Sequence, residues 1–353
     1  MKRIVLFAPG AVPPWTEGRK IFVRDLAAAL RSRGIDAQVL DGAPASSTAT
    51  MILNALLGLR SAGNHAHAET VVVAFPFGTF HGLRGRINAW ILRRSRSLCA
   101  RAGFVHIPLF YSCVGLDVEL LGRRYGPAVA VGRSAPGMSS IHLGIRHLAD
   151  AWQPSGEGLK RLLFLCGYQK PTVRALHDVL YERGLIDLLS AGDAMATANI
   201  RLTIAVPFLR DAHMRSLLQA EIASRCPTLD VDFQGEVDPY SLFQSHDAFA
   251  FPYRSQHSVF VPTSLLEAMS FGIPVLAADH AMYRDLTGAA SGPRCGLHEV
   301  ANSMDVARTL LEMQKNYTFV VERARAVSIE VRDEWTVECA AGELLAAIGV
   351  VSA

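Results

Sequence analysis

The sequence predicts an α/β fold in which two doubly wound parallel sheets carry helices on both faces. Three observations point to this fold. Short runs rich in β-branched residues alternate with helix-like runs along the whole chain, which is the pattern of strand–helix–strand units. Half of the residues (50%) are hydrophobic, as strands buried on both faces require. The chain has 353 residues, more than one core usually holds, so we expect two domains.

The first half of the chain begins the alternation. Phe22, Leu26 and Leu30 recur four residues apart, which places them on one face of a helix that Gly34 ends. The strands predicted here are Lys2–Ala8, Asp36–Leu40, Val71–Phe75, Val105–Tyr111 and Ala128–Val131, and the helices are Arg19–Gly34 and Leu83–Arg101. Because helices separate the strands, we expect the strands to be parallel.

The second half repeats this scheme. Its predicted strands are Arg161–Cys166, Arg201–Val206, Leu229–Phe233, Ala248–Pro252 and Val275–Ala278, and its helices are Val173–Arg183, Met214–Ala223 and a run that starts at Pro262. Pro, Ser and Gly cluster in AWQPSGEG, which predicts a boundary between domains 1–150 and 151–332. The helical pattern Trp335–Ile348, within segment 333–353, is predicted to cross back to the first domain. Ligands of such sheets bind at the carboxyl ends of the strands, here expected in a cleft between the domains.

Charge is distributed unevenly along the chain. Residues 1–150 carry 18 Lys and Arg against 8 Asp and Glu, a net charge of +10, and residues 151–353 carry 17 against 24, a net charge of −7. Either the first half meets an anionic partner or the two halves attract each other. No apolar run is long enough to span a membrane, and the start MKRIVLFAPG fits a strand better than a signal peptide, so we expect a cytoplasmic protein. The six cysteines lack metal-site spacing and are expected to be reduced core thiols.

The most informative stretch reads VFVPTSLLEAMSFGIPVLA. Pro262 suits the first position of a helix, and Thr263 and Ser264 follow with free backbone N–H groups. The first turn of a helix is an anion site, because those N–H groups lack partners and the helix dipole is positive there. Glu267 comes about one turn later, and Gly272 stops the helix. A phosphate on the helix start would therefore lie near a carboxylate able to accept hydrogen bonds from sugar hydroxyls.

This stretch resembles the donor-site helix of family 4 glycosyltransferases, which have the GT-B fold of two Rossmann-like domains. Other segments are similar to family landmarks in the same order: EGRKIFVRDLAAALRSRGIDAQVL to the first glycine loop and helix, IHLGIRHLADAWQP to the linker, LLFLCGYQK to the phosphate loop, and VDFQGEVDPYSLFQSHDAFAFP to the nucleobase loop. The resemblance implies a retaining, metal-independent, hexosyltransferase-like enzyme. It would move a sugar from a UDP- or GDP-sugar to an acceptor hydroxyl, with no cofactor and no nucleic-acid partner.

The resemblance also implies which residues hold the donor: Gly18, Lys170, Arg210, Gly235, Val237, Thr263, Ser264, Leu265 and Glu267. Gly18 would admit the pyrophosphate, because glycine has no Cβ. Lys170 would oppose the charge of the leaving diphosphate, and Glu267 would take the ribose hydroxyls. Each has an alternative interpretation: Gly18 as a turn glycine, Lys170 as a solvated lysine, and Thr263 and Ser264 as simple helix caps. A carboxylate in the apolar run LLEAMSF needs a partner, which favours a function for Glu267.

Three positions depart from the family pattern. Val259 stands where the family has a first Glu, Tyr168 where an Arg precedes the loop lysine, and Val114 near a family His. Nearby polar residues are the predicted substitutes, with His257, Asp117 and Arg254 as catalytic candidates and Arg210 in place of the missing Arg. The departures leave two alternatives open. One is a catalytically weakened homologue that binds a nucleotide sugar or partners another transferase, and the other is a sugar-nucleotide epimerase.

The predicted helix at residues 83–101 is rich in arginine. Arg86, Arg93 and Arg96 share one face of it, opposite an apolar face. This is either an ordinary helix with a basic outer side or a contact for an anionic membrane surface. The second interpretation predicts a protein at the periphery of the inner membrane face. The acceptor stays open between a lipid-linked molecule, a glycan and a small metabolite.

Overall fold

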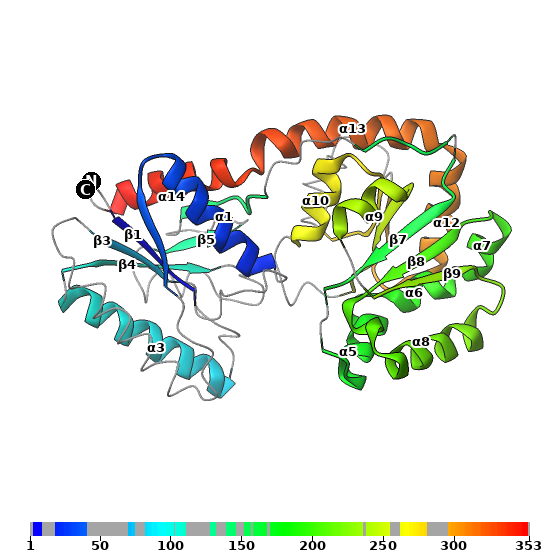
Figure 1. The fold of residues 1–353 in the computed structure, drawn as a ribbon, viewed down its shortest axis with the longest axis horizontal. Coiled ribbons are helices and arrows are strands. Elements are labelled where there is room, and N and C mark those ends of the chain that lie inside the picture. Colours follow the sequence, from blue (N-terminus) through cyan, green and yellow to red (C-terminus); the bar gives the residue numbers. More distant parts are fainter. Residues whose placement is uncertain are drawn as a thin grey trace. The chain divides into compact units, whose positions relative to one another are not determined.

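The computed structural model of the chain describes two compact units (Figure 1). Unit 1 consists of Met1–Arg146, His257–Pro262 and Glu334–Ala353, and unit 2 of His147–Gln256 and Thr263–Asp333. The structure describes residues 3–8, 18–40, 70–74, 82–101, 103–110, 128–131, 139–145, 152–156, 158–167, 170–235, 238–254, 262–280 and 296–351. None of the helices within these ranges combines the length and hydrophobicity needed to cross a membrane.

Unit 1 is built on a parallel six-stranded sheet in the order β2-β1-β3-β4-β5-β6. Its strands are β1 (Arg3–Phe7), β2 (Asp36–Leu40), β3 (Thr70–Ala74), β4 (Val105–Phe110), β5 (Val129–Val131) and β6 (Ser139–Ile141). Its helices are α1 (Gly18–Ser32), α3 (Gly82–Arg101) and α14 (Val337–Val351). Helices α1 and α14 cover one face of the sheet and α3 the other (Figure 1). The predicted parallel sheet is confirmed.

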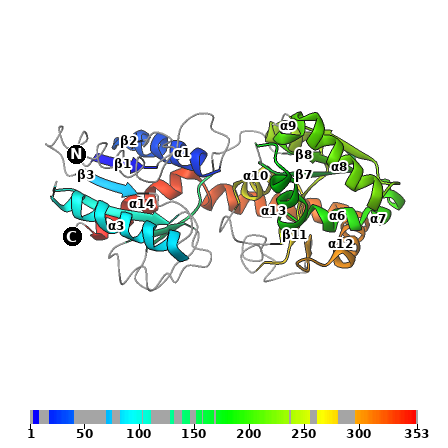
Figure 2. The same ribbon diagram turned by 90° about the horizontal axis from the view of Figure 1, so that it is seen from below.

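The C-terminal helix α14 packs on α1 of unit 1, as predicted (Figures 1 and 2). The Arg33 guanidinium donates a hydrogen bond to the Glu338 carbonyl over 2.8 Å. The Glu343 carboxylate accepts the backbone N–H of His142 at 2.6 Å and lies 2.5 Å from the His142 ring. A Cβ on Gly144 would lie 2.3 Å from the Val337 Cα, so only glycine permits this approach of the two segments.

Unit 2 contains a second parallel sheet, in the order β12-β11-β10-β7-β8-β9. Its strands are β7 (Arg161–Leu165), β8 (Arg201–Ala205), β9 (Val231–Gln234), β10 (Ala248–Phe251), β11 (Val275–Ala278) and β12 (Leu297–His298). Its helices are α5 (Val173–His177), η1 (Asp178–Glu182), α6 (Leu185–Ser190), α7 (Gly192–Thr197), η2 (Pro207–Arg210), α8 (Ala212–Arg225), α9 (Pro239–Ser245), α10 (Thr263–Phe271), α12 (Ser303–Lys315) and α13 (Tyr317–Glu334). In Figure 1, α9 and α10 lie on one side of this sheet and α6 and α8 on the other.

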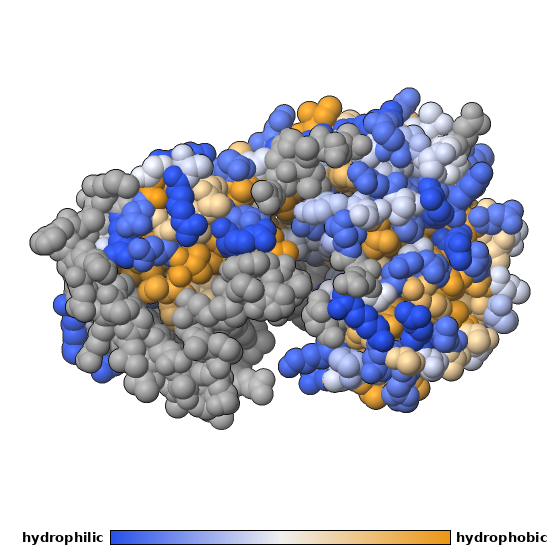
Figure 3. Space-filling model, in the orientation of Figure 1, coloured by the Kyte–Doolittle hydropathy of each residue, from blue (hydrophilic) through white to orange (hydrophobic). Residues whose placement is uncertain are grey.

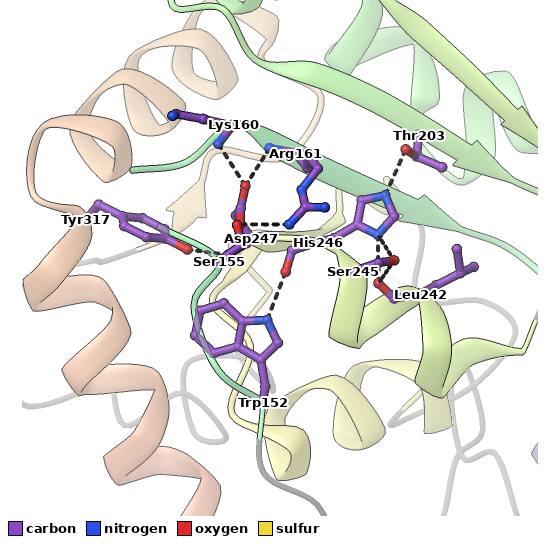
Figure 4. Close-up of polar contacts among 10 residues, drawn as sticks. All are labelled: Trp152, Ser155, Lys160, Arg161, Thr203, Leu242, Ser245, His246, Asp247 and Tyr317. Atoms are coloured by element: carbon purple, nitrogen blue, oxygen red, sulfur yellow. Dashed lines mark hydrogen bonds and ion pairs between the residues drawn. The ribbon is translucent and has the colours of Figure 1, made fainter. Parts of the chain in front are cut away.

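A buried carboxylate organises the amino edge of this second sheet (Figure 4). Asp247, directly before β10, is fully buried. Its carboxylate accepts hydrogen bonds from the Ser155 hydroxyl at 2.5 Å and from the backbone N–H groups of Lys160 and Arg161 at 3.0 and 2.8 Å. The Tyr317 hydroxyl donates to the Asp247 carbonyl over 3.1 Å. Asp247 thus ties the segment before β7 and the start of α13 to the edge opposite the carboxyl ends of the strands.

Some predicted elements differ from the observed ones. The predicted helix Val173–Arg183 divides into α5 and the π-helical turn η1. The sequence pattern does not reveal this division, because a π turn keeps an apolar spacing close to that of an α-helix. Pro262 precedes α10, whose first helical residue is Thr263, so Pro262 is not the first helical position. The strands β6 and β12 and the helices α6, α7, α12 and α13 were not predicted. The two strands are only three and two residues long and carry too few side chains to show a period.

Large apolar side chains are scattered over the described surface of unit 2. Figure 3 shows orange patches separated by hydrophilic side chains. The large apolar residues exposed in this unit are Val173, Met304, Leu311, Phe319 and Ile329. Scattered exposure of this kind is ordinary on protein surfaces.

Candidate functional site

The carboxyl edge of the unit 2 sheet gathers most of the residues predicted to bind a ligand. All six strands are parallel, so their carboxyl ends lie along one edge. Lys170 follows β7, Arg210 ends the turn after β8, Gly235 follows β9 and Arg254 follows β10. Ligands of open parallel sheets bind at this edge, which makes it the candidate site.

Helix α10 presents only its predicted ligand-binding side chains to solvent. Thr263, Ser264 and Glu267 are partly exposed, and the other six of its nine residues are buried. A helix turns by about 100° per residue, so these three side chains share one arc of the helix. The same arc begins at the N-terminus, where backbone N–H groups lack intrahelical partners. Residues that can bind an anion and hydroxyl groups therefore line the accessible side of α10.

The end of α10 follows from its sequence. Gly272 has a φ of +85°, in the left-handed region that glycine adopts without strain. Its N–H donates to the carbonyls of Ala268 at 3.2 Å and Met269 at 3.0 Å, which closes the last turn. Leu265 is fully buried and contributes its backbone, not its side chain, to any ligand contact.

Gly235 and Arg210 join the carboxyl ends of β9 and β8. The Arg210 guanidinium donates to the Gly235 carbonyl over 3.1 Å. A Cβ on Gly235 would lie 2.8 Å from the Arg210 backbone nitrogen, so a larger residue would push the two segments apart. The Arg210 side chain is exposed, which keeps a cation at this part of the edge.

Lys170 lies on the loop after β7 and is exposed. Two residues later, the Thr172 hydroxyl accepts the Ala175 N–H at 3.1 Å and caps α5. The cap fixes the far end of the loop and leaves the lysine amine available to an anion.

Arg254 forms an ion pair with a buried carboxylate. Its guanidinium donates to both carboxylate oxygens of Asp187, at 2.7 and 2.6 Å, and Asp187 is only 2% exposed. The hydrogen bonds to Asp187 raise the pKa of Arg254. The sequence predicts a catalytic role for Arg254, whereas these contacts direct its guanidinium toward the protein.

Two histidines lie at the carboxyl ends of β11 and β12. The ring of His280 lies 2.7 Å from the Tyr253 carbonyl, to which its Nε2 donates. His298 is fully buried, and its Nδ1 lies 2.9 Å from the Glu299 carbonyl. Burial lowers the pKa of His298 most strongly, although the neighbouring Asp187 and Asp305 raise it. The neutral ring then donates through Nδ1, and its Nε2 has no hydrogen-bond partner in the described part of the chain.

Other predicted site residues lie elsewhere. Gly18 is the first residue of α1 in unit 1. Val237, Asp117 and His257 lie outside the described residues, as do the family departures Tyr168, Val114 and Val259. Within the described ranges, no group of His, Cys, Asp and Glu side chains could hold a metal ion.

A comparison with protein families finds a match to part of the chain. Residues 172–316 match the family described as "Glycosyl transferases group 1". These residues make up less than half of the chain, and they are similar to that group of glycosyltransferases. The matched residues run from the cap of α5 to the end of α12 and contain Arg210, Gly235 and all of α10. No curated protein sequence matches the chain.

Solved structures place the chain in the GT-B fold. Sucrose-phosphate synthase from Thermosynechococcus elongatus aligns with a TM-score of 0.69 at 13% identity, over 99% of this chain and 100% of that one. HepE from Anabaena, solved with UDP, aligns with a TM-score of 0.67 at 13% identity over the same shares. A glycosyltransferase from Rickettsia africae aligns with a TM-score of 0.65 at 10% identity, over 98% and 97%. The fold prediction is confirmed.

Sequence reasoning missed Asp187, the partner of Arg254. A usable signal was present, because Asp187 is a carboxylate in the apolar run LIDLLSA, the same anomaly that singled out Glu267. His280 and His298 gave no signal, because a single histidine after a short strand is common.

Proposed function

We propose that this protein is a glycosyltransferase that uses a UDP-sugar and that α10 holds the donor. The accessible arc of Thr263, Ser264 and Glu267 is the observation that carries this proposal. HepE, a structural neighbour, was solved with UDP and with UDP-glucose, which supports uridine as the base and a hexose as the sugar.

Each donor group has a chemical match at the carboxyl edge. The diphosphate binds at the first turn of α10, where N–H groups and the helix dipole favour anions. The Glu267 carboxylate accepts hydrogen bonds from the two ribose hydroxyls, and the backbone around Gly235 and Val237 contacts the base. When the glycosidic bond breaks, negative charge grows on the departing diphosphate, and Lys170 and Arg210 stabilise it. Gly18, at the start of α1, is proposed to admit the pyrophosphate.

The reacting centre departs from the family, since Val259 replaces a glutamate. We propose that His257 supplies a polar group on the donor side and that Asp117 orients the acceptor hydroxyl. An imidazole can exchange a proton near neutral pH, and an ionised carboxylate can accept the hydrogen bond of a hydroxyl, so each residue type suits its proposed role.

Binding of UDP and the substitution Glu267→Gln test the donor site. Charge-assisted hydrogen bonds contribute about 1.5–3 kcal/mol, so we expect Glu267→Gln to weaken UDP binding about 10- to 100-fold. Titration calorimetry and the UDP-induced rise in Tm measure the loss, with GDP and ADP as alternative bases. Turnover is measured with a panel of UDP-sugars in the presence of acceptors.

Glu330→Gln is the matched control, because Glu330 is an exposed helical glutamate of the same unit. It should leave UDP binding unchanged. Equal binding by the wild type and Glu267→Gln would overturn the proposed site. UDP binding without transfer or hydrolysis would instead support a weakened homologue, and interconversion of UDP-sugars would support an epimerase.

A second observation bears on the acceptor. Helix α3 carries six arginines and no acidic residue. Trp90, Arg93, Arg94 and Arg101 are exposed and recur at helical spacing, so they form one outward stripe, which we call the basic stripe. We propose that the basic stripe binds an anionic membrane surface and that the acceptor is presented there. The predicted Arg86 and Arg96 lie on the same helix, and Arg96 also lies close enough to His106 to affect its charge.

A further inference from the structure

The chain leaves the carboxyl end of β10 through a constrained segment, Pro252–Arg254. Here contacts come from four places: η1, the residues between η1 and α6, helix α6 itself, and the end of β11.

The backbone of this segment is fixed on two sides. The Arg254 N–H donates to the Glu182 carbonyl over 3.0 Å, and His280 donates to the Tyr253 carbonyl over 2.7 Å. Gly184 has a φ of +70°, and a Cβ there would lie only 1.9 Å from the Pro252 carbonyl oxygen. The approach of these segments therefore requires glycine at position 184.

The side chains add further contacts. The Tyr253 ring stacks on Phe251 with centroids 3.7 Å apart, and the Arg183 guanidinium lies 4.5 Å from the Tyr253 ring centroid. Arg254 reaches the other way and forms its two hydrogen bonds with Asp187 of α6. Removal of either partner would leave the other without its ion pair beside the buried end of α6.

The chain needs only eight residues to pass from Arg254 to Thr263, the first residue of α10. The anchor at Arg254 is therefore one end of the short connection that leads into the proposed donor helix. A guanidinium that spends both of its parallel donors on Asp187 is oriented by the protein core and faces away from a donor.

We propose that Arg254 is a positioning residue, which acts through Asp187 to fix the start of α10 for donor binding. The inference rests on the proposed function and differs from the catalytic role that the sequence predicts for Arg254. The pair sets where the chain departs from β10, and thereby holds the N–H groups of the first turn of α10 and Glu267 in one arrangement.

Two substitutions test the pair from its two sides. Arg254→Lys keeps the charge but loses the two-pronged geometry, and Asp187→Asn keeps the shape but loses the charge. Amide hydrogen exchange at residues 267–271, whose N–H groups bond within α10, should accelerate at least tenfold in both variants. The KM for the UDP-sugar should rise about tenfold in both, while kcat changes less.

Ser155→Ala is the matched control, because it removes one hydrogen bond from the buried Asp247 at the opposite edge of the same sheet. It should lower Tm and leave both the exchange of α10 and the KM unchanged. This separates positioning from general destabilisation, which reduces the folded fraction without altering KM. If Asp187→Asn does not fold, Arg254→Lys carries the test alone.

Unchanged exchange of α10 in folded Arg254→Lys would overturn the proposal. So would normal exchange and KM in Asp187→Asn together with a loss of kcat above a thousandfold in Arg254→Lys, since Arg254 would then act on the substrate directly. The exchange measurement needs no turnover. A wild type that binds no UDP would contradict the proposed function, and the exchange of α10 in the variants could still be compared with that of the wild type.

Discussion

At the scale of single residues, the buried His106 makes the stability of the fold depend on pH. His106 in β4 is 8% exposed, and neither ring nitrogen has a hydrogen-bond partner within the described ranges. Burial, and to a lesser extent Arg96, lower its pKa to about 4. The unfolded chain, with a histidine pKa near 6.5, binds more protons than the folded one between these values. Stability is therefore full above about pH 6.5 and falls as the pH drops toward 4.

Replacing this histidine should flatten the pH dependence. The shift corresponds to at most about 3 kcal/mol, so His106→Leu should remove a loss of that order between pH 7 and pH 4.5. Urea unfolding at several pH values measures it. Burial also lowers the pKa of His246 and His298 in unit 2, so the variant should flatten only part of the whole-chain slope. His213→Gln, at an exposed position, is the control, and an unchanged slope in His106→Leu would contradict the assignment.

At the same scale, the sequence predicts some site residues and hides others. Thr263, Ser264 and Glu267 could be placed because helix position alone determines which groups point outward near an N-terminus. The contact of Arg254 could not, because its partner Asp187 is 67 positions away, in helix α6. Local periodicity carries no information about which distant side chain a guanidinium meets.

At the scale of the elements, the spacing of apolar residues predicts the strands and helices, but it does not predict local distortions within a helix. The strand β2 has the predicted bounds, whereas the predicted helix at Val173–Arg183 changes to a π turn at η1. The turn brings the Glu182 carbonyl to the Arg254 N–H. These two residues are far apart in the sequence and meet only in the folded sheet, so local periodicity cannot predict their contact. Helices α12 and α13 were missed although Val306, Leu310 and Met313 recur at helical spacing and are buried.

Helix α3 supports a prediction about surfaces. Each arginine near an anionic bilayer contributes about 1 kcal/mol, so Arg93→Gln with Arg94→Gln should weaken binding by about 2 kcal/mol, or roughly 30-fold. Co-sedimentation with vesicles that contain an anionic lipid measures this, and zwitterionic vesicles should not bind. About 0.5 M salt should abolish binding, because it shortens the range of the attraction. Trp90→Ala should weaken binding further at low salt.

The matched control removes two arginines from unit 2. Arg201 and Arg225 are exposed and pair with acidic neighbours, so Arg201→Gln with Arg225→Gln changes the net charge equally. This variant should bind vesicles like the wild type. Equal losses in both double variants, or no sedimentation of the wild type at low salt, would contradict the role of the basic stripe.

At the scale of the whole molecule, each unit is made of segments that are not consecutive in the sequence. The last helix, α14, belongs to unit 1, where Ala340, Ala341 and Leu344 are fully buried, while α13, which directly precedes it, belongs to unit 2. Each unit has its own parallel sheet and core, so we expect calorimetry to resolve two unfolding transitions. A ligand stabilises the unit that binds it, so UDP should raise the transition of unit 2, which carries most of the proposed donor residues, more than that of unit 1.

Removing residues 337–353 should then act on unit 1 alone. The deletion uncovers the face of α1 that α14 covers and removes the partners of Arg33 and His142, so the unit 1 transition should fall or disappear. The UDP-responsive transition should keep its temperature and its shift with UDP. Glu343→Gln, which weakens only the contact with His142, should lower the unit 1 transition by a few degrees at most. A single transition that moves as a whole with UDP would show that the units unfold together, and loss of the UDP response on truncation would show that α14 supports the donor site.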